Sequence, residues 1–489
     1  YEAPYEAPGA TPPPDANLDD FWDAIDNPQV APEEPYLPPG TNKYKELLDL
    51  HWRFYEAQRS GPEPSWNRIS WRGSSHLNDA VVGGLYDAGD YLKLNFPLAS
   101  SMIHTGHGLV EFMSGCSSSR TEALRTYKWA IKYLLDCLDV ENGQYIAQIG
   151  DPKIDHNYWG RAEEQNTRRP AYIYKRDSMP ASDLYGSVSA ALAQASVVFG
   201  NEGDPAFARD CLNGALELFK WGDGKPGKYS DYYKEQTKIY RSTGGDDSMA
   251  TAAGWLYRKT GDRAWLEKAR SYFSYNKADV YAGWDSLWGS HVAHMISLAD
   301  RGVQIPGIEE YRRWSTNKYW RAWLEADGFQ SIVKTPKGMH YPKWNAWANL
   351  AFSTTSSSHA LLQAKFTPDR QLRSRLMNYA RAQADYAIGG NGIRSYVIGW
   401  GANWPKFAHH AGASCPNTGP CGQAAFRSTQ PNPNGPEGAM VAGPGGVRKS
   451  RTDPDGAYSD RRNDYVTNEV AVDYNAGLNT LLCGLIELF

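Results

Sequence analysis

The apolar residues of this 489-residue chain recur with helical spacing from Asn42 onward. In segment after segment they stand at i, i+3, i+4 and i+7, the spacing that gathers side chains on one face of a helix. We predict helices at 43–59, 97–115, 121–139, 183–199, 205–221, 246–260, 263–274, 285–301, 308–325, 344–364, 368–387 and 474–488. Strand patterns are short and few, as around Ser395 to Ile398, so the predicted fold class is all-α.

About twelve helices in sequential hairpins suit a closed double ring, in which inner helices are wrapped by outer ones. Long non-helical stretches separate the helices, at 60–96, 140–182, 222–245, 326–343 and 388–473. Loops of this length in a compact domain are usually functional, so we expect them to build the site at one end of the ring.

Residues 1–40 have a different composition from the rest. They hold Tyr-Glu-Ala-Pro twice in tandem, then Pro12-Pro13-Pro14 and Pro38-Pro39, with acidic residues between them. This composition is typical of an extended linker or tail. We therefore predict a tail at 1–40 and one barrel domain at 41–489.

The overall composition excludes some classes of partner. A net charge of −4 and a pI near 6.3 provide no basic field for nucleic acid. No apolar run approaches 18 residues, so we expect no membrane span. The chain has 18 Trp and 31 Tyr against 14 Phe, and amphipathic rings suit wet stacking contacts such as those with sugars.

Two of the six cysteines, Cys415 and Cys421, enclose a short polar loop, and we predict a disulfide between them. The others lie in or beside apolar helical patterns, which is compatible with free core thiols but leaves their pairing open: Cys116, Cys137, Cys211 and Cys483. The predicted disulfide favours a secreted, extracellular protein.

Two acidic clusters stand at opposite ends of the chain. Asp87 and Asp90 follow a glycine-containing turn, and Glu469 lies in the second cluster. Hydrolysis of a glycosidic bond needs two carboxyl groups, one that gives a proton to the leaving oxygen and one that activates water. Taken alone, Asp-Ala-Gly-Asp is also typical of turn and capping residues.

The residues around these clusters carry a resemblance. Trp71-Arg72-Gly73 and the stretch from Gly83 to Asp90 resemble the opening of glycoside hydrolase family 9, the endoglucanase family, in its animal-like form. The family's acidic signature is met in full by Tyr458, Asp460, Tyr465, Glu469, Ala471, Asn475 and Ala476. The resemblance covers roughly 43–489. It implies an (α/α)6 barrel that cleaves β-1,4-glucan with inversion, with Asp90 as base, Asp87 as the carboxylate that helps hold water, and Glu469 as general acid.

The resemblance also implies sugar-binding residues, at His156, Trp159, Trp344, His409 and Tyr474. The second family signature is only partly kept, because Ala411 stands where the family has Arg. Arg offers a two-pronged fork to hydroxyl groups that Ala cannot replace. The loop from Cys415 to Cys421, or Arg427, is a candidate substitute. Ile398 and Ser74 also depart from the family pattern, which suggests an altered substrate range.

A calcium site is a further expectation. The turn from Ser242 to Asp247 resembles a calcium loop found in part of the family, and the ligands would be Ser242, Gly245, Asp246 and Asp285. The competing interpretation is helix capping, since acidic residues favour the first turn of a helix. We expect no cofactor for the chemistry itself, and no histidine or cysteine spacing indicates zinc.

These observations predict a monomeric endo-β-1,4-glucanase that acts on β-1,4-glucan or cello-oligosaccharides. Two alternatives remain at this stage. One is a non-catalytic carbohydrate-binding protein, which would require a missing acid or base. The other is an (α/α) hydrolase acting on xylan or mixed-linkage glucan.

Overall fold

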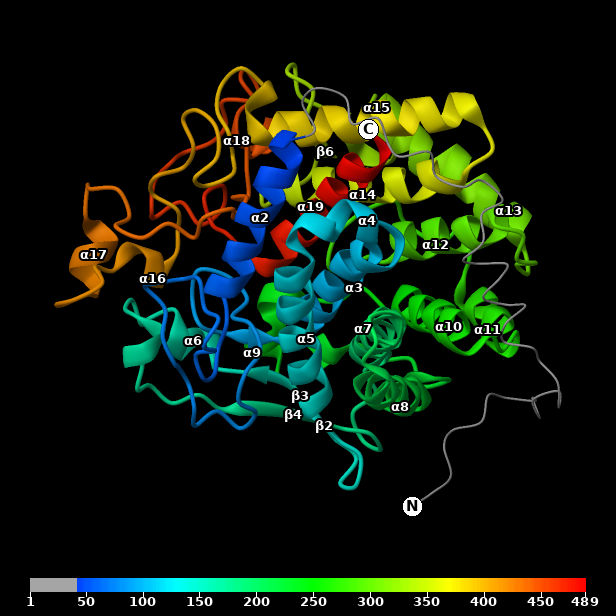
Figure 1. Cartoon of the computed structure of the whole chain (residues 1–489), viewed down its shortest axis with the longest axis horizontal. Helices are drawn as coiled ribbons and strands as arrows, with labels where there is room; N and C mark the ends of the chain where they lie inside the picture. Colours follow the sequence, from blue (N-terminus) through cyan, green and yellow to red (C-terminus); the bar gives the residue numbers. More distant parts are fainter. Residues whose placement is uncertain (1–41) are drawn as a thin grey trace.

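The structure is a computed structural model that describes residues 42–489 (Figure 1). The predicted Pro-rich tail lies outside the described residues. None of the helices within 42–489 is long and apolar enough to cross a membrane.

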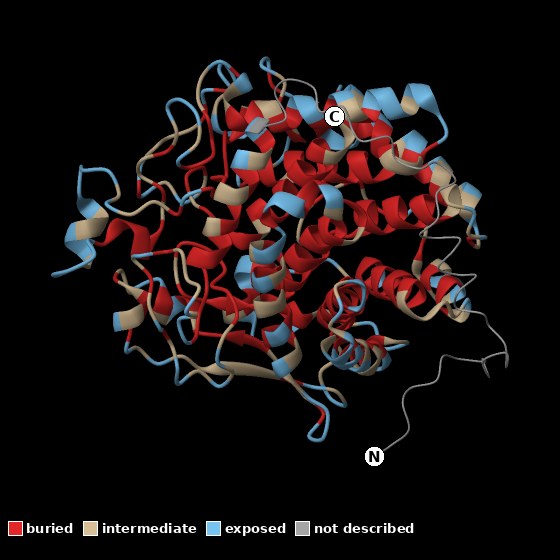
Figure 2. Ribbon diagram, viewed as in Figure 1, coloured by how far each residue is buried: buried red, intermediate tan, exposed pale blue. Residues whose placement is uncertain are grey.

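Six helices form a closed inner ring, in which each packs against the next and the last returns to the first. They are α3 (Asn95–Glu111), α7 (Ser182–Asn201), α10 (Asp246–Thr260), α12 (Trp288–Asp300), α14 (Asn349–Phe366) and α19 (Val472–Leu488). Nearly every residue of these helices is buried, as the colouring of Figure 2 shows. A helix that is covered on all sides has no solvent-facing stripe, which explains why these sequences lack a regular polar face.

Small residues allow the inner helices to approach closely. A Cβ added at Gly477 of α19 would lie 2.5 Å from the Cα atom of Thr355 in α14. A Cβ added at Gly186 of α7 would lie 2.9 Å from the backbone nitrogen of Met249 in α10. No larger residue fits at either position, because real Cβ atoms do not come this close to backbone.

A second set of helices covers the ring from outside. They are α2 (Asn42–Ala57), α5 (Arg120–Asp136), α8 (Pro205–Gly222), α11 (Ala264–Tyr272), α13 (Ile308–Trp314) with its π-helical continuation η5 (Ser315–Glu325), and α15 (Arg370–Asp385). Side-chain caps fix two of their starts, since Asp204 accepts from Phe207 N–H at 3.2 Å and Asp369 from Gln371 N–H at 2.9 Å. The predicted double ring of helix pairs is therefore confirmed.

The loops hold short elements that the periodicity does not reveal. A small antiparallel sheet joins β1 (Lys93–Leu94), β2 (Leu138–Asp139), β3 (Gln144–Ile149) and β4 (Ala171–Lys175), with β3 in the centre. A two-stranded ribbon pairs β5 (Ile332–Lys334) with β6 (His340–Pro342). The predicted strand near Ser395 to Ile398 forms only an isolated bridge, Val397 with Met440. Short helices α4 (Met113–Cys116), α6 (Pro152–Asp155), α9 (Lys234–Thr237), α16 (Ala411–Ser414), α17 (Gln423–Arg427) and α18 (Gly446–Lys449) complete the chain.

Two disulfides are present. Cys415 pairs with Cys421, as predicted. Of the four cysteines whose pairing the sequence left open, Cys116 and Cys483 pair and tie α4 to the last helix. The helical pattern placed each in a core but could not reveal that α4 and α19 are neighbours. Cys137 and Cys211 are buried free thiols.

Candidate active site

Three long loops, 60–96, 140–182 and 388–473, meet around the Asp87–Asp90 turn, and the short helices α6 and α16 of the second and third loops lie at the left of Figure 1. Backbone hydrogen bonds fasten the turn to the 388–473 loop at two points: Val472 N–H donates to Asp87 O at 2.8 Å and Ala411 N–H to Gly89 O at 2.7 Å. Tyr91 N–H donates to Asp155 Oδ1 in the 140–182 loop at 2.9 Å. A Cβ at position 89 would lie 2.2 Å from the carbonyl oxygen of His409. Gly89 is therefore required for the acidic turn to meet the His409 loop.

Asp87 is buried and shares a hydroxyl group with a second carboxylate. Tyr240 Oη lies 2.9 Å from Asp87 Oδ2 and 3.2 Å from Asp473 Oδ1. Burial, together with the charges of Asp473 and Asp90, raises the pKa of Asp87 well above its usual range. Burial also raises the pKa of Asp473 to about 7. The sequence analysis missed both Tyr240 and Asp473; each stands within two residues of a predicted site residue, Ser242 or Tyr474.

Asp90 faces the exposed side of the site. Its Oδ2 lies 2.9 Å from Nε2 of His156, and the two side chains are 20% and 52% exposed. The hydrogen bond to Asp90 raises the pKa of His156. The sheet brings these residues together, because β1 follows the Asp90 turn directly and Lys93 pairs with Ile149, just before α6 and His156.

Glu469 is half-buried beside both aspartates. Burial and then the charges of Asp90 and Asp87 raise the pKa of Glu469 well above its usual value, while a hydrogen bond from the Gly89 backbone partly offsets them. Such an environment keeps a carboxyl group protonated. The structure thus brings together the three carboxyl groups that the sequence placed at opposite ends of the chain.

Other residues of the acidic signature hydrogen-bond to the backbone of the loop and have a structural role. Asp460 accepts from the backbone N–H groups of Lys406 and Phe407 at 2.8 and 3.0 Å. Asn475 accepts from Met440 N–H at 2.6 Å and donates to Ala471 O at 2.8 Å. These bonds hold the backbone on both sides of Glu469.

Aromatic side chains lie around the three carboxyl groups. The ring of Trp159 lies 5.1 Å from that of His409, whose Nδ1 is 2.6 Å from the carbonyl oxygen of Arg462. Trp344 is 49% exposed. Tyr474 is buried, and its hydroxyl accepts from Nε1 of Trp347 at 2.6 Å. Trp347, which is 42% exposed, was missed because it belongs to no motif.

Ala411 does not reach the open surface. It is buried against Tyr86, Tyr91 and Ala162, and it begins the short helix α16. Arg427, the candidate substitute for the missing Arg, is exposed at the end of α17. Position 411 therefore offers no charged fork to a ligand.

The four predicted calcium ligands lie at the start of α10 and in the 279–287 loop. Thr243 N–H donates to Asp285 Oδ1 at 3.0 Å, and Asp246 is exposed in the first helical turn. No three His, Cys, Asp or Glu side chains converge closely enough for a metal anywhere in 42–489, so hydroxyl and backbone oxygens of Ser242 and Gly245 would be needed.

Buried carboxyl groups surround this turn. Burial raises the pKa of Asp183 to about 7, of Asp247 to about 8 and of Asp285 to about 7, and their mutual charges add to the effect. Of these three carboxyl groups only Asp285 belongs to the predicted ligand set, since Asp183 accepts from Tyr229 N–H and Asp247 from Leu287 N–H. A hard divalent cation bound beside them would favour the ionised form of all three.

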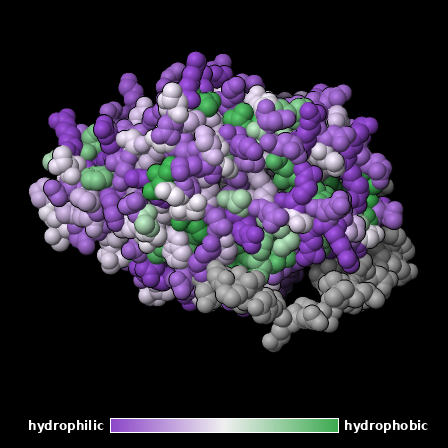
Figure 3. Space-filling model, turned by 90° about the horizontal axis from the view of Figure 1, so that it is seen from above, coloured by the Kyte–Doolittle hydropathy of each residue, from purple (hydrophilic) through white to green (hydrophobic). Residues whose placement is uncertain are grey.

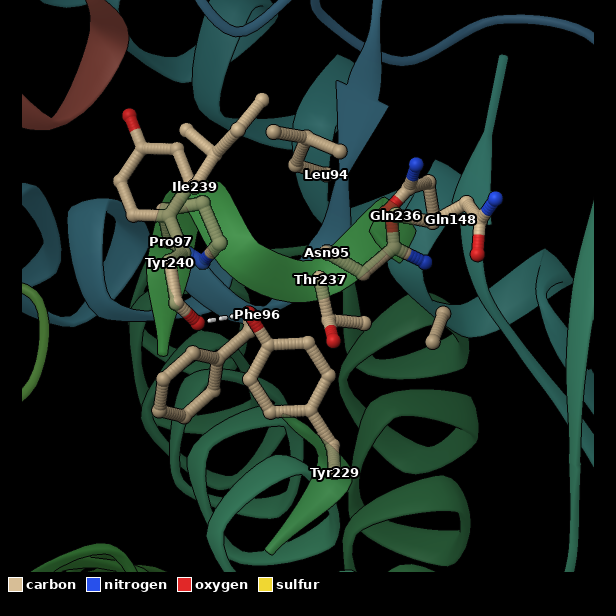
Figure 4. A pocket seen from close by; sticks show the side chains of 11 residues that line it. Leu94, Asn95, Phe96, Pro97, Gln148, Tyr229, Gln236, Thr237, Ile239 and Tyr240 are labelled. Carbon is tan, nitrogen blue, oxygen red and sulfur yellow. Dashed lines mark hydrogen bonds between the residues drawn. The ribbon is translucent and has the colours of Figure 1, made fainter. Parts of the chain in front are cut away.

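A small, partly open pocket lies beside Tyr240, which is one of its lining residues (Figure 4). Its walls include Phe96, Gln148 and Tyr229, and Tyr229 Oη donates to the carbonyl oxygen of Tyr240. Its volume of about 10 Å³ has room for about one water molecule. A space of this size is too small for a sugar. The hydrogen bond from Tyr229 instead helps to hold the backbone of Tyr240 in place.

A double ring of helices that carries three clustered carboxyl groups beside exposed tryptophans belongs to the class of glycoside hydrolases. The model of Glycosyl hydrolase family 9 matches residues 44–482. The chain belongs to this family.

Solved structures and curated relatives agree. The endoglucanase of the termite Nasutitermes takasagoensis is 33% identical, with a TM-score of 0.81, over 91% of this chain and 99% of that one. The endoglucanase CelQ of Clostridium thermocellum, complexed with cellotriose, is 32% identical with a TM-score of 0.76, over 91% and 71%. Endoglucanase 15 of Arabidopsis thaliana is 33% identical over 88% of this chain and 90% of its own length. Endoglucanase B of Cellulomonas fimi is 32% identical, but the chain spans only 42% of its length.

Proposed function

We propose that this protein is an endo-β-1,4-glucanase that hydrolyses internal bonds of cellulose-like glucans with inversion. The observation that carries the proposal is the meeting of Asp87, Asp90 and Glu469, in which burial and then the charges of both aspartates raise the pKa of Glu469. A carboxyl group that keeps its proton beside a second carboxyl group that accepts one from water is the arrangement that general acid and base catalysis requires.

The roles follow from the environments. Glu469 keeps its proton and gives it to the oxygen of the leaving sugar. Asp90, held by His156 and open to the cleft, takes a proton from the attacking water. Asp87, held by Tyr240, orients that water. With both catalytic functions present, the site does not support the alternative of a non-catalytic binding protein.

Isosteric substitutions test these roles. Glu469→Gln and Asp90→Asn should each lower kcat by about 10³-fold or more, because each removes one proton-transfer function. Circular dichroism and cello-oligosaccharide binding should stay unchanged. Glu437→Gln and Asp177→Asn, the same chemical changes at exposed positions, serve as matched controls and should keep full activity. Near-wild-type turnover in either site variant would refute the assignment.

The proposed substrate is a β-1,4-glucan. Relatives similar over most of this chain are named endoglucanases, and the rings of Trp159, Trp344 and Trp347 offer stacking surfaces for sugar faces. Reducing-sugar release from carboxymethyl cellulose should exceed release from lichenan and xylan. Preference for xylan or lichenan would favour the second alternative, and no release from any of the three would favour a binding protein.

We also propose that calcium binds at Ser242, Gly245, Asp246 and Asp285, where it would neutralise the neighbouring carboxylates. Without a cation, the folded protein should lose stability as pH rises from about 4 to about 8, because carboxyl groups whose pKa is raised in the folded state bind more protons there than in the unfolded chain. Calcium should therefore raise Tm more at pH 8 than at pH 5.

Scanning calorimetry with calcium or with a chelator checks this prediction. Asp285→Asn should abolish the calcium-dependent gain in Tm, whereas Asp177→Asn should preserve it. An equal Tm with and without calcium at pH 8 would contradict the site.

Secretion and a monomeric state remain part of the proposal. Two disulfides favour an oxidising compartment. The face seen in Figure 3 is largely hydrophilic, with hydrophobic residues in small groups, as expected of a surface that binds no second copy.

A further inference from the structure

The segment that follows Ala411 packs against the segment that carries His156 and Trp159. It runs through α16, the Cys415–Cys421 disulfide and α17. Arg161 Nε donates to Pro416 O at 2.9 Å and its Nη2 to Gly419 O at 2.8 Å. These bonds join the disulfide loop to the segment that carries His156 and Trp159.

A second arginine fixes the part of the segment around α17. Arg462 is buried, and its guanidinium donates to the carbonyl oxygens of Ala425 at 2.9 Å, Ser428 at 2.8 Å and Gln430 at 2.9 Å. The carbonyl oxygen of the same Arg462 holds the ring of His409. The position of α17 is thereby coupled to the position of a predicted sugar-binding residue.

Phe426 is the aromatic residue of α17, the short helix that Arg462 and the disulfide loop hold in place. Its ring lies 4.7 Å from that of Trp159 and 6.4 Å from that of His409, and the side chain is half-buried. The ring of His409 lies 6.0 Å from that of Tyr465, which lies 5.4 Å from Trp347. Phe426 thus ends a continuous row of rings that passes along the site.

We propose that Phe426, held in place by the disulfide loop and Arg462, forms an additional sugar subsite beside Trp159 and His409. This inference rests on the proposed glucanase function and deepens it. Ala411 is buried and supplies no polar fork, so the subsite would bind a glucosyl unit through its apolar face rather than its hydroxyl groups. Binding by an apolar ring face depends less on which hydroxyl groups are free.

Steady-state kinetics on cellotetraose, cellopentaose and cellohexaose tests the subsite. Phe426→Ala and Phe426→Leu should each raise KM for the longer substrates about tenfold, with kcat nearly unchanged. Phe426→Tyr and Phe426→Trp should keep KM near the wild-type value, because they keep a flat ring. If Phe426 had only a structural role, Phe426→Leu would keep the wild-type KM, and Phe426→Ala would lower kcat and Tm instead of raising KM.

Gln423→Ala, a change at the exposed start of the same short helix, is the matched control, and its KM should equal that of the wild type. Arg427→Ala tests the competing idea that a charge replaces the missing Arg, and a raised KM in this variant with an unchanged KM in Phe426→Ala would favour that idea. The double variant Cys415→Ser/Cys421→Ser should also raise KM, because the segment that positions Phe426 loses its disulfide.

Reducing-end labelled cellohexaose shows which bonds are cut. Loss of the ring should change which bonds are cut, because productive binding no longer places a glucosyl unit against residue 426. An unchanged KM and product pattern in Phe426→Ala would overturn the subsite while leaving the glucanase function intact. Inactive wild-type protein would instead contradict the proposed function.

Discussion

Tyr240 has one hydroxyl proton and faces two carboxyl groups, Asp87 and Asp473. A hydroxyl group donates one hydrogen bond, so both contacts are satisfied only when one of the two carboxyl groups is protonated and donates to the tyrosine oxygen. Burial raises the pKa of both Asp87 and Asp473, so this pair of carboxyl groups is able to hold one proton between them. When Asp473 carries that proton, Tyr240 donates to Asp87 and fixes its orientation.

Removing the hydroxyl group should therefore reduce turnover. We expect Tyr240→Phe to lower kcat by about 10- to 100-fold, the equivalent of one hydrogen bond to a charged group, with little change in KM. Kinetics on carboxymethyl cellulose, with calorimetry to confirm an unchanged fold, measures this. A wild-type kcat would mean that Asp87 needs no support from Tyr240.

For individual residues of the site, the sequence allowed a prediction only where the residue belongs to a motif. It indicated Asp87, Asp90 and Glu469, which the fold brings together. Tyr240 and Trp347 belong to no pattern, and their closeness to the carboxyl groups arises from loops whose course no periodicity describes. Ala411 was noticed as a departure, but its burial, and the presence of Phe426 nearby, required the structure.

At the scale of elements, the helices of both rings were predictable because burial on one or more sides leaves a regular apolar spacing. Short elements such as β1, α16 and α17 carry too few residues to show a period. The pairing of Lys93 with Ile149, which places His156 beside Asp90, depends on such a short element. The chemistry is thus positioned by the parts of the chain that are hardest to predict.

The Cys116–Cys483 disulfide joins α4 to α19 across 367 residues of sequence. A bond that closes so long a loop restricts the unfolded chain strongly. Replacing both cysteines with alanine should lower the free energy of unfolding by about 3–5 kcal/mol while activity at 25 °C remains.

Guanidinium denaturation of the oxidised proteins measures this loss. The Cys415→Ser/Cys421→Ser pair, which opens a loop of only 6 residues in sequence separation, should cost less. An unchanged denaturation midpoint in the Cys116→Ala/Cys483→Ala variant would contradict a stabilising role.

At the scale of the whole molecule, the ring explains why distant carboxyl groups meet. The Asp87–Asp90 turn leads through β1 into α3, the Glu469 loop leads into α19, and these two helices are neighbours that close the ring. The first and last inner helices therefore bring the two acidic loops to the same end. Sequence periodicity predicted the number and order of helices, but the closure that joins α3 to α19 is a tertiary contact.

The account's central claim is that Glu469 and Asp90 act as acid and base on opposite sides of a glycosidic bond, and the stereochemistry of the product tests it most directly. Proton NMR of cellohexaose during early hydrolysis should show new reducing ends appearing first as the α-anomer, because direct attack by water inverts the β-linkage. Asp90→Asn should yield neither anomer. Initial appearance of the β-anomer would contradict the account.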